Sequence, residues 1–325
     1  MLTRQRKIIV TGGAGFIGSH LVDNLIDEGH LVMCLDNFHN FYDPVIKLAN
    51  IARHRNNPRF FLVRLDINEY EKLLHTIIGW HPDIVIHLAA RAGVRESLKD
   101  PFAYIDVNIN GTLHVLNAAI LSGAKKFIFG SSSSVYGINQ KVPFCENDSL
   151  LTPVSPYAAS KIAGEALCHS YSHLHEMPTV ALRFFTVYGP RQRPDLAIHK
   201  FAGLMKEQKP IPLYGDGTSR RDYTYVGDII TGIRGAIEYY SNQYYDVFNL
   251  GNSQTIELME LIGLLEEKLG QKAIIDRKPP EPGDVPQTWA HIEKARNRLG
   301  FEPKTPIGEG LSFFIEWLNG KPALT

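Results

Sequence analysis

The chain is poor in cysteine and carries no net charge, and each shortage excludes a class of protein. Three of its 325 residues are cysteines, Cys34, Cys145 and Cys168, and no two of them form a C-x-x-C pair. An odd, sparse set fits a reducing compartment better than a disulfide framework, so we expect a cytoplasmic protein. Basic and acidic residues balance at 34 each. This balance gives no support for a nucleic-acid or membrane-surface partner, and we predict no metal site.

Long apolar stretches are also missing. No apolar run reaches the length of a membrane span, and the first residues, MLTRQRKIIVTGG, lack the apolar core of a signal peptide. We find no internal repeat and no low-complexity tract. Apolar residues make up 44% of the chain and charged residues 21%. These values are ordinary for a globular protein, and the length allows one large domain or two modest ones.

Short apolar runs alternate with longer helical patterns through the first 185 residues. Runs that are apolar throughout predict buried strands, and the segments between them predict helices. Such an alternation is typical of a parallel sheet covered by helices on both faces, and right-handed crossovers make the sheet doubly wound. The predicted strands are residues 7–11, 31–36, 60–66, 83–90, 125–132 and 179–185, and the predicted helices are 16–29, 44–54, 69–78, 101–122 and 156–175.

The rhythm changes after Phe185, where prolines and the turn GDGT (215–218) break the chain into shorter pieces. We therefore predict an α/β nucleotide-binding domain over residues 1–185 and a smaller, mainly separate α/β domain over 186–325. A strand predicted at 246–251 indicates that the chain returns to the first domain near residues 225–250.

The segment VTGGAGFIGSH places Gly12, Gly15 and Gly18 between a predicted strand and a predicted helix. Gly12 allows a tight turn and Gly15 lets the backbone approach a pyrophosphate. Gly18 permits close helix–strand packing, while the helix N-terminus attracts the anion. Asp36 ends the next strand, where a carboxylate binds a ribose 2′-hydroxyl and repels a 2′-phosphate, which favours NAD over NADP. The alternative, a glycine turn followed by a surface aspartate, fits this strand–turn–helix setting less well.

A tyrosine and a lysine stand four residues apart in SPYAASKIAGE (155–165). Ser155 is a good helix N-cap, so Tyr157 and Lys161 share one helical face. A nearby ammonium lowers a phenol pKa from its usual value of about 10, which allows general base or acid catalysis near neutral pH. For an isolated motif, a half-buried aromatic beside a solvated lysine, paired with Glu165, is the commoner explanation. The glycine motif upstream changes that balance.

Hydroxyl groups follow the fifth predicted strand in GSSSSVYG (130–137). Ligands of doubly wound sheets bind outside the carboxyl ends of the strands, so these serines would lie over a bound cofactor. One of them could donate a hydrogen bond to a substrate oxygen as its charge changes. Asp66 and Ile67 end another strand, where an adenine could be held, although Asp66 could equally cap the following helix.

Eight motifs occur in order along the chain: T-G-x-x-G-x-x-G, D-N-F, H-L-A-A, N-I-N-G-T, S-S-S-S-V-Y-G, Y-x-x-x-K, R-F-F-T-V-Y-G-P and P-G-D. With them the chain resembles an extended short-chain dehydrogenase/reductase over nearly its whole length. Within that superfamily it is most similar to the UDP-glucuronate 4-epimerases, through LDNFHNFYDP (35–44), HLAARAGVRES (87–97), RFFTVYGPRQRPDLA (183–197) and PGDVPQTWA (282–290).

This resemblance implies a Rossmann fold, an NAD that stays bound through turnover, and a C-terminal domain for the UDP-sugar. The implied reaction converts UDP-glucuronate to UDP-galacturonate through a 4-keto intermediate. Helices 101–122 and 156–175 resemble the pair that forms a four-helix homodimer interface in the superfamily. Two alternatives stay open: a 4-epimerase of a neutral UDP-sugar such as UDP-glucose or UDP-galactose, and a non-catalytic, nucleotide-sensing member.

Catalytic roles follow from the same resemblance. Tyr157 is the implied base and Lys161 its helper, and Ser132 stands in the catalytic hydroxyl position with Ser133 and Ser134 as near alternatives. Similar sugar-nucleotide 4,6-dehydratases carry an Asp-Glu pair where this chain has Ser133 and Ser134, and UDP-glucuronate decarboxylases usually carry a glutamate at the position of Ser134. The implied cofactor contacts are Gly12, Gly15, Phe16, Ile17, Gly18, Asp36, Asn37, Asp66, Ile67, Leu88, Ala89, Ala90, Asn108, Tyr157, Lys161, Phe184 and Val187, although Phe184 could equally be a core residue.

Arginines are the candidates for the anionic parts of the substrate, because guanidinium forks suit pyrophosphate and carboxylate. We expect Arg95 and Arg193 near the hexuronate carboxylate. Arg221 is expected near the diphosphate, since Glu281 replaces an arginine that galactose-type epimerases have. Arg220 reads as a surface charge, and Arg91 replaces a glutamine common in relatives. The predicted substrate contacts are Arg95, Ser133, Thr186, Arg191, Arg193, Arg221 and Asp284.

Overall fold

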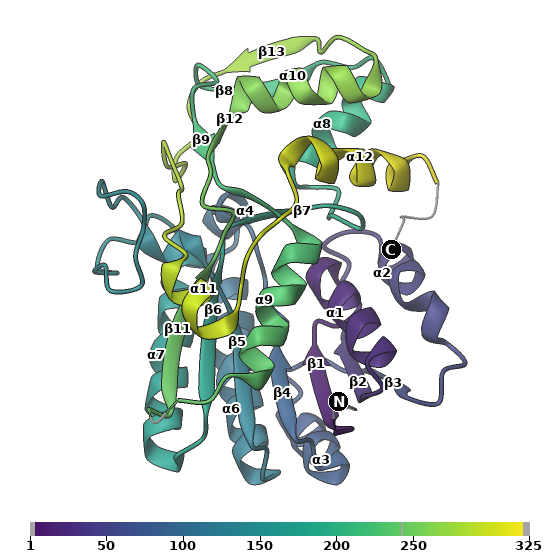
Figure 1. Ribbon diagram of the computed structural model, residues 1–325, viewed down its shortest axis with the longest axis vertical. Helices are drawn as coiled ribbons and strands as arrows, with labels where there is room; N and C mark the ends of the chain where they lie inside the picture. The colour runs from purple at the N-terminus through teal and green to yellow at the C-terminus, as the bar shows by residue number, and fades with distance from the viewer. Residues whose placement is uncertain (1–3, 242, 321–325) are drawn as a thin grey trace.

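A parallel sheet of seven strands forms the lower half of the molecule in Figure 1, in the order β11-β6-β5-β4-β1-β2-β3. The computed structural model describes residues 4–241 and 243–320. Residues 1–3, 242 and 321–325, which the predicted domains include, lie outside the described residues. The strands are β1 (Lys7–Thr11), β2 (Leu31–Asp36), β3 (Phe60–Arg64), β4 (Ile84–His87), β5 (Lys126–Ser132), β6 (Thr179–Phe184) and β11 (Tyr245–Leu250).

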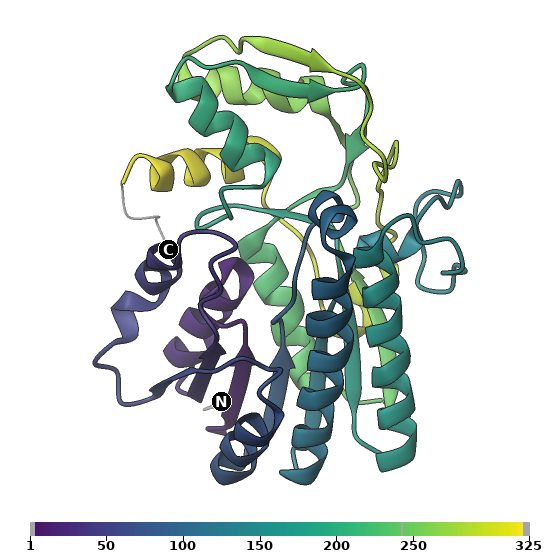
Figure 2. The same ribbon diagram turned by 180° about the vertical axis from the view of Figure 1, so that it is seen from behind.

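Helices cover both faces of this sheet, as the two opposite views show (Figures 1 and 2). One face carries α1 (Phe16–Asp27) and α9 (Val226–Glu238), and the other carries α3 (Tyr70–Trp80), α6 (Gly111–Leu121) and α7 (Pro156–His175). Side chains of β1 alternate between the two buried cores: Ile8 and Val10 belong to one and Ile9 to the other. The predicted doubly wound α/β fold is confirmed.

The strand order reverses between β1 and β4. The chain runs outward through β1, β2 and β3 and then crosses back to β4, β5 and β6 on the other side. In open parallel sheets such a reversal opens a crevice at the carboxyl ends of the strands. The glycine turn after β1 and the serines after β5 both lie at this edge.

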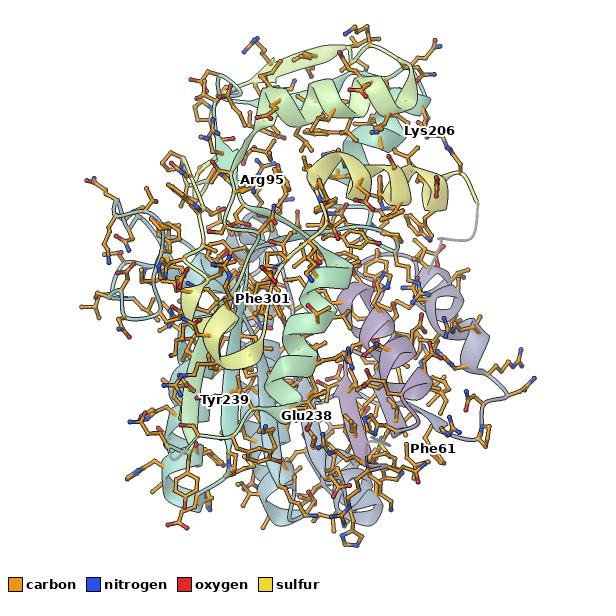
Figure 3. The ribbon with its side chains drawn as sticks, in the orientation of Figure 1. Phe61, Arg95, Lys206, Glu238, Tyr239 and Phe301 are labelled. Atoms are coloured by element: carbon orange, nitrogen blue, oxygen red, sulfur yellow. The ribbon has the colours of Figure 1, made fainter. Side chains whose placement is uncertain are left out.

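One predicted strand is less buried than its sequence suggests. The sequence predicts a buried strand over residues 60–66. The observed strand, β3, lies at the edge of the sheet, and its Phe61 is 40% exposed (Figure 3). The number of strands that flank a given strand cannot be inferred from its own sequence. An apolar edge strand therefore has the same sequence pattern as a central strand.

The helix predicted over 101–122 is divided into three parts. It begins as α5 (Pro101–Ile105), widens into a π-helical turn over Asp106–Asn110 and continues as α6. The π turn buries Asn108, whose side chain accepts from the amide of Arg91 at 2.8 Å and donates to its carbonyl at 2.9 Å. Single π turns inside helices occur frequently at functional sites.

Shorter elements form the upper half of Figure 1. They pack around a separate buried core that includes Phe201, Leu261 and Phe314. No helix within the described ranges combines the length and the apolar character that a membrane crossing requires. The elements not yet given are α2 (Pro44–Ile51), α4 (Val94–Lys99), β7 (Thr186–Tyr188), α8 (Ala197–Lys206), β8 (Ile211–Tyr214), β9 (Arg220–Arg221), β10 (Tyr223–Tyr225), β12 (Ile256–Glu257), α10 (Leu258–Leu269), β13 (Ile275–Lys278), α11 (Glu293–Leu299) and α12 (Ile307–Leu318), with short 3-10 turns at 52–54 and 133–136.

A buried histidine ends β4 and makes the stability of the fold sensitive to acid. The Nδ1 atom of His87 lies 2.7 Å from the hydroxyl of Thr11, and its Nε2 atom lies 3.0 Å from that of Thr112. Burial lowers the pKa of His87 from 6.5 to about 3, so the folded protein holds a neutral imidazole.

We expect this histidine to lower the free energy of unfolding below pH 6.5. The unfolded chain protonates the imidazole there and the folded chain does not, so each further pH unit costs ~1.4 kcal/mol. Urea unfolding should show His87 contributing a loss of about 2 kcal/mol between pH 7 and pH 5. In His87→Gln this loss should be smaller, whatever its stability at pH 7. An identical loss in both proteins would contradict the prediction.

Candidate active site

The turn between β1 and α1 consists largely of glycines, so a ligand can approach its backbone amides closely. Gly12 adopts a positive φ of 68°, and a Cβ atom there would lie 2.8 Å from the amide nitrogen of Ala89. A Cβ atom on Gly18 would lie 2.2 Å from the carbonyl oxygen of Gly12. No side chain caps α1 at Gly15, and its first turn holds no acidic residue. These features fit the pyrophosphate of a dinucleotide such as NAD, which binds the free amides of a helix N-terminus.

Gly18→Ala should weaken cofactor retention. The added methyl group would collide with backbone of the same turn, because the oxygen of Gly12 cannot move without disturbing the tight turn. We expect NAD content after gel filtration to fall at least about tenfold, together with a loss of roughly 1–3 kcal/mol in unfolding free energy. Gly263→Ala, at a helix position with nothing within 4 Å of the new atom, is the matched control. Full NAD content in Gly18→Ala would contradict this.

Asp36 ends β2 beside the glycine turn and is buried. Its carboxylate accepts from the amides of Phe38 at 2.8 Å and Ala14 at 3.3 Å, and from Nζ of Lys47 at 3.2 Å. A carboxylate has about four acceptor positions, so one remains for a ribose hydroxyl. The sequence did not reveal Lys47, which offsets the charge of Asp36 from α2, 11 residues away.

Asp66 follows β3 and contacts the loop after β2. Asn37 donates to Asp66 at 2.7 Å, and the other carboxylate oxygen accepts from the amide of Asn68 at 2.9 Å. The N-cap of α3 is Glu69, so the alternative in which Asp66 caps the following helix is wrong. Ile67 is buried against the helical run at Gly111. The pair Asn37–Asp66 therefore lies at the edge where an adenosine would lie.

Other predicted cofactor residues surround the same crevice. Leu88, Ala89 and Ala90 follow β4 directly, and Ala89 lies against Gly12. Asn108 uses its side chain on Arg91 and on the hydroxyl of Ser160, at 2.9 Å, so it holds two segments together. Phe184 ends β6 and Val187 lies in β7, and both are partly buried against the core. Phe16 and Ile17 form the first turn of α1.

The tyrosine–lysine pair lies on α7 as expected. Ser155 caps this helix by accepting from the amide of Ala158 at 3.1 Å. Lys161 is buried, and its ammonium donates to the carbonyl of Gly130 at 2.7 Å instead of to the phenol. Burial lowers the pKa of Lys161 to about 8.

The predicted effect of Lys161 on Tyr157 is wrong in this structure. Burial raises the pKa of the Tyr157 phenol, and the groups that oppose this rise are the hydrogen-bonding hydroxyl of Ser132 and the positive charge of Arg193. The hydroxyl oxygens of Ser132 and Ser134 lie 3.2 Å apart, so Ser132 can accept from Ser134 while it donates to the phenol oxygen. Ser132 is thus the serine that reaches the phenol. The cation facing Tyr157 comes from the loop after β7, a distant segment that local spacing could not reveal.

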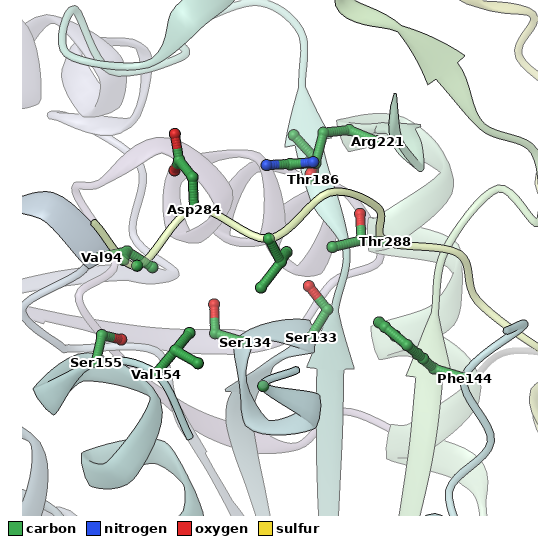
Figure 4. Close-up of a pocket in the computed structure, with 13 residues that line it drawn as sticks. Val94, Ser133, Ser134, Phe144, Val154, Ser155, Thr186, Arg221, Asp284 and Thr288 are labelled. Atoms are coloured by element: carbon green, nitrogen blue, oxygen red, sulfur yellow. The ribbon is translucent and has the colours of Figure 1, made fainter. Parts of the chain in front are cut away.

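A cavity of about 140 Å³ opens above these serines (Figure 4). Ser133 and Ser134 lie on one side of it, opposite Arg221 and Asp284. Sequence reasoning predicted five of the 13 lining residues as site residues and missed four apolar side chains, two glycines and the hydroxyl groups of Ser155 and Thr288. The lining consists of Val94, Ser133, Ser134, Gly137, Phe144, Val154, Ser155, Thr186, Arg221, Gly283, Asp284, Val285 and Thr288.

Arg95 lies at the rim of this cavity, between the sheet and the upper layer (Figure 3). Its Nη2 atom donates to Asp284 at 2.7 Å, and its guanidinium covers the ring of Tyr214 at 4.2 Å from the ring centre. Arg220 is not a free surface charge as predicted, because it is half-buried and donates to the hydroxyl of Thr255 at 3.0 Å.

Arg193 and Arg191 bind different carboxylates in the structure. Arg193 is 16% exposed and holds Asp195 with two hydrogen bonds of 2.9 and 2.6 Å. It also covers the ring of Phe41, 5.3 Å from the ring centre. Arg191 instead donates to Asp23 on α1 at 2.8 Å. The structure does not bring Arg191 into the cavity, so its predicted substrate contact lacks geometric support.

Comparison with known proteins places this arrangement in a family. Residues 9–313 match the family model of GDP-mannose 4,6 dehydratase. The chain belongs to this family. The predicted resemblance to NAD-dependent epimerases and dehydratases of the extended short-chain dehydrogenase/reductase type is thereby confirmed.

Several known proteins are similar to this chain over nearly its whole length. UDP-glucuronate 4-epimerase of Thermodesulfobacterium geofontis is 40% identical over 95% of both chains. The crystal structure of UDP-glucuronic acid 4-epimerase from Bacillus cereus, in complex with UDP-glucuronic acid and NAD, is 39% identical with a TM-score of 0.90, and the match covers 97% of this chain and 99% of that one. UDP-glucose 4-epimerase from Thermotoga maritima, with UDP-glucose, is 34% identical with a TM-score of 0.88 over the same shares.

Proposed function

We propose that this chain is an NAD-dependent UDP-glucuronate 4-epimerase, which interconverts UDP-glucuronate and UDP-galacturonate. The observation that carries the proposal is the group of Tyr157, Ser132 and Arg193 at the carboxyl end of the sheet, beside a cavity floored by Ser133 and Ser134. At these two positions the cavity offers hydroxyl groups in place of carboxyl acids that could drive loss of water, and its one lining carboxylate among the described residues, Asp284, lies on the opposite side. The likeness to epimerases that bind UDP-glucuronic acid and NAD supports the same assignment.

NAD, when bound, would supply the acceptor for the hydride on C4 of the sugar and the donor that returns it to the other face. The glycine turn with the first turn of α1 would hold its pyrophosphate, and Asp36 with Lys47 would hold its ribose. Lys161 would lie beside the bound cofactor, where its ammonium donates to the carbonyl of Gly130 near the end of β5.

Tyr157 would take the proton from the 4-hydroxyl group as C4 is oxidised and return it after the sugar has turned. Its burial favours the neutral phenol, so Ser132 and Arg193 are needed to stabilise the phenolate. We assign the base role to Tyr157 because it is the titratable group on α7 that the catalytic serine reaches.

Arg221 is the arginine that the geometry favours for the diphosphate, since it lines the cavity opposite the serines. For the hexuronate carboxylate, the geometry favours Arg193 over Arg95. Arg193 acts on Tyr157, whereas Arg95 lies at the rim. Each of the two is bound to a carboxylate, Asp195 or Asp284, which the carboxylate of the substrate would replace. Ser133, Thr186 and Asp284 complete the proposed substrate contacts.

Incubation of the purified protein with UDP-glucuronate, without added NAD, tests the proposal. We expect UDP-galacturonate to appear in a separation of the sugar nucleotides, because the cofactor is regenerated in each turnover. The runner-up function is a 4-epimerase of a neutral UDP-sugar, which the likeness to a UDP-glucose 4-epimerase favours. It predicts turnover of UDP-glucose at least equal to that of UDP-glucuronate.

Assembly, domain division and location remain part of the proposal. Apolar side chains on α5, α6 and α7 are exposed, with Phe102 84% exposed and Leu174 71% exposed. A homodimer through these helices would cover them, and light scattering of the purified protein would measure its mass. The division at residue 185 and a cytoplasmic location stay predictions.

A further inference from the structure

One face of α7 holds the end of β5 at consecutive residues. Tyr157, Lys161 and Glu165 follow one another at intervals of four and therefore form a single stripe. The ammonium of Lys161 binds the carbonyl of Gly130, and the carboxylate of Glu165 accepts from the hydroxyl of Ser131 at 2.5 Å. Tyr157 meets the hydroxyl of the next residue along the strand. Three helix side chains thus hold three successive strand residues.

Helix and strand approach each other closely at this stripe. A Cβ atom on Gly164 would lie 2.5 Å from the ring of Phe129, so a larger residue than glycine could not stand there without a shift. The same ring lies beneath Lys161, with its centre 4.9 Å from the ammonium nitrogen. Any displacement of the strand end would therefore pass directly to the groups on α7.

Glu165 is itself held by a buried arginine of β6. Arg183 donates to it through Nε at 2.9 Å and through Nη2 at 2.7 Å, and its Nη1 atom donates to Tyr136 at 2.9 Å. The side chains of this ion pair are 7% and 4% exposed. Replacing such a pair by apolar residues is often neutral or stabilising, so stability alone does not explain the charges at this position.

The groups around Lys161 come from several elements. Cys168 and Glu165 lie on its own helix, His87 on β4 and Arg183 beyond Glu165 on β6. Burial keeps the thiol of Cys168 and the imidazole of His87 neutral, because it raises the pKa of the first and lowers that of the second. Among these groups of the described chain, Glu165 is the anion, and its charge favours the ammonium form of Lys161.

We propose that Glu165 is a positioning residue for the epimerisation, which fixes the end of β5 through Ser131 and keeps Lys161 charged. The inference rests on the proposed function, in which Tyr157 and Lys161 act. Glu165 touches neither substrate nor cofactor. It works through the strand end that presents Gly130 and Ser132, and through the charge beside Lys161.

Three variants separate these effects. Glu165→Gln combined with Arg183→Met removes both charges at similar volume and leaves no unpaired buried charge, which alone would be strongly destabilising. Ser131→Ala removes the link to the strand but keeps the ion pair. Asp228→Asn is the matched control, because Asp228 is a buried carboxylate on α9 that accepts from the amides of Lys304 at 3.2 Å and Thr305 at 3.1 Å.

Two measurements read these variants. The first is kcat for UDP-glucuronate across pH, with NAD content and circular dichroism as checks of the fold. The second is the titration of Lys161 in the protein without substrate, followed by the 13Cε resonance of labelled lysine and assigned with Lys161→Arg. The second measurement does not depend on any activity.

We expect the double variant to lose kcat by about tenfold or more, since small misplacements of reacting groups are costly. The alkaline side of its pH profile and the Lys161 titration should both move to lower pH, because the anion that favours the ammonium form is gone. Ser131→Ala should lower kcat several-fold and leave the alkaline side of the pH profile at the wild-type pH. Asp228→Asn should leave both the alkaline side of the profile and the titration where they are in the wild type.

A double variant with wild-type pH dependence and an unmoved Lys161 titration would overturn the proposal. So would a loss of kcat equal at every pH, which is what a merely structural role predicts. If the double variant does not fold, Glu165→Gln combined with Arg183→Gln, which also leaves no unpaired buried charge, takes its place in the same two measurements. A wild-type protein without turnover would overturn the proposed function instead, while the titration would still test the charge effect.

Discussion

Tyr157→Phe should lower kcat for UDP-glucuronate by about 10³-fold or more, which is the largest effect we expect from one substitution. The change removes the oxygen that takes the proton in the proposed function, and general base catalysis typically contributes 10²–10⁴-fold. No nearby group is suited to replace it, because Ser132 is an alcohol and Lys161 is engaged with a carbonyl. The measurement is turnover of UDP-glucuronate by purified protein, with NAD and UDP binding measured in parallel.

Tyr104→Phe is the matched control for this variant. The ring of Tyr104 meets that of Tyr157 edge-on, with centres 6.1 Å apart, and its hydroxyl donates to the carbonyl of Ala92 at 3.2 Å. It should retain turnover within several-fold of the wild type. If Tyr157→Phe kept both ligand binding and cellular function, the alternative of a non-catalytic, nucleotide-sensing protein would return.

Arg193→Ala should slow epimerisation by roughly 10–100-fold and raise the yield of a pentose by-product. The 4-keto intermediate has a ketone at C4 beside the carboxylate on C5, and such a β-keto acid loses carbon dioxide readily. Loss occurs when the breaking bond stands perpendicular to the carbonyl plane. A guanidinium that fixes the carboxylate away from this alignment protects the intermediate. Arg193 also acts on Tyr157, so its loss weakens the base as well.

Chromatography of the sugar nucleotides gives the ratio of UDP-galacturonate to UDP-pentose directly. Arg191→Ala is the control, because Arg191 binds Asp23 on α1 and does not belong to the lining of the cavity. Its product ratio should equal that of the wild type. An unchanged product ratio in Arg193→Ala would show that Arg193 does not protect the intermediate. A changed ratio in Arg191→Ala would support the predicted contact of Arg191 with the substrate.

Sequence reasoning succeeded where a single segment determines the outcome. The buried strands follow from their own apolar residues, and Gly12, Gly18 and Ser155 occupy positions that one turn or one helix end requires. Sequence reasoning failed where the outcome depends on packing between two segments that are distant in the sequence. The exposure of Phe61 depends on the lack of a neighbour beyond β3, and the partner of Lys161 depends on how closely α7 approaches β5.

The arginines show the same limit. Arg191 and Arg193 are two residues apart and chemically identical, so their spacing cannot say which one meets the substrate. Their partners in the fold separate them, because Arg191 binds Asp23 on α1 and Arg193 binds Asp195. The charge of Arg193 acts on Tyr157, which lies 36 positions away in the sequence, and only the folded chain shows this.

The bond between Arg95 and Asp284 has an energetic consequence. Its two side chains are 41% and 39% exposed, and ion pairs exposed to this degree contribute about 0–1 kcal/mol. Asp284 also lines the cavity, so an anionic group that binds Arg95 displaces a carboxylate that is held only weakly. Salt screens such a pair, so the contact between α4 and the segment 281–288 weakens as ionic strength rises.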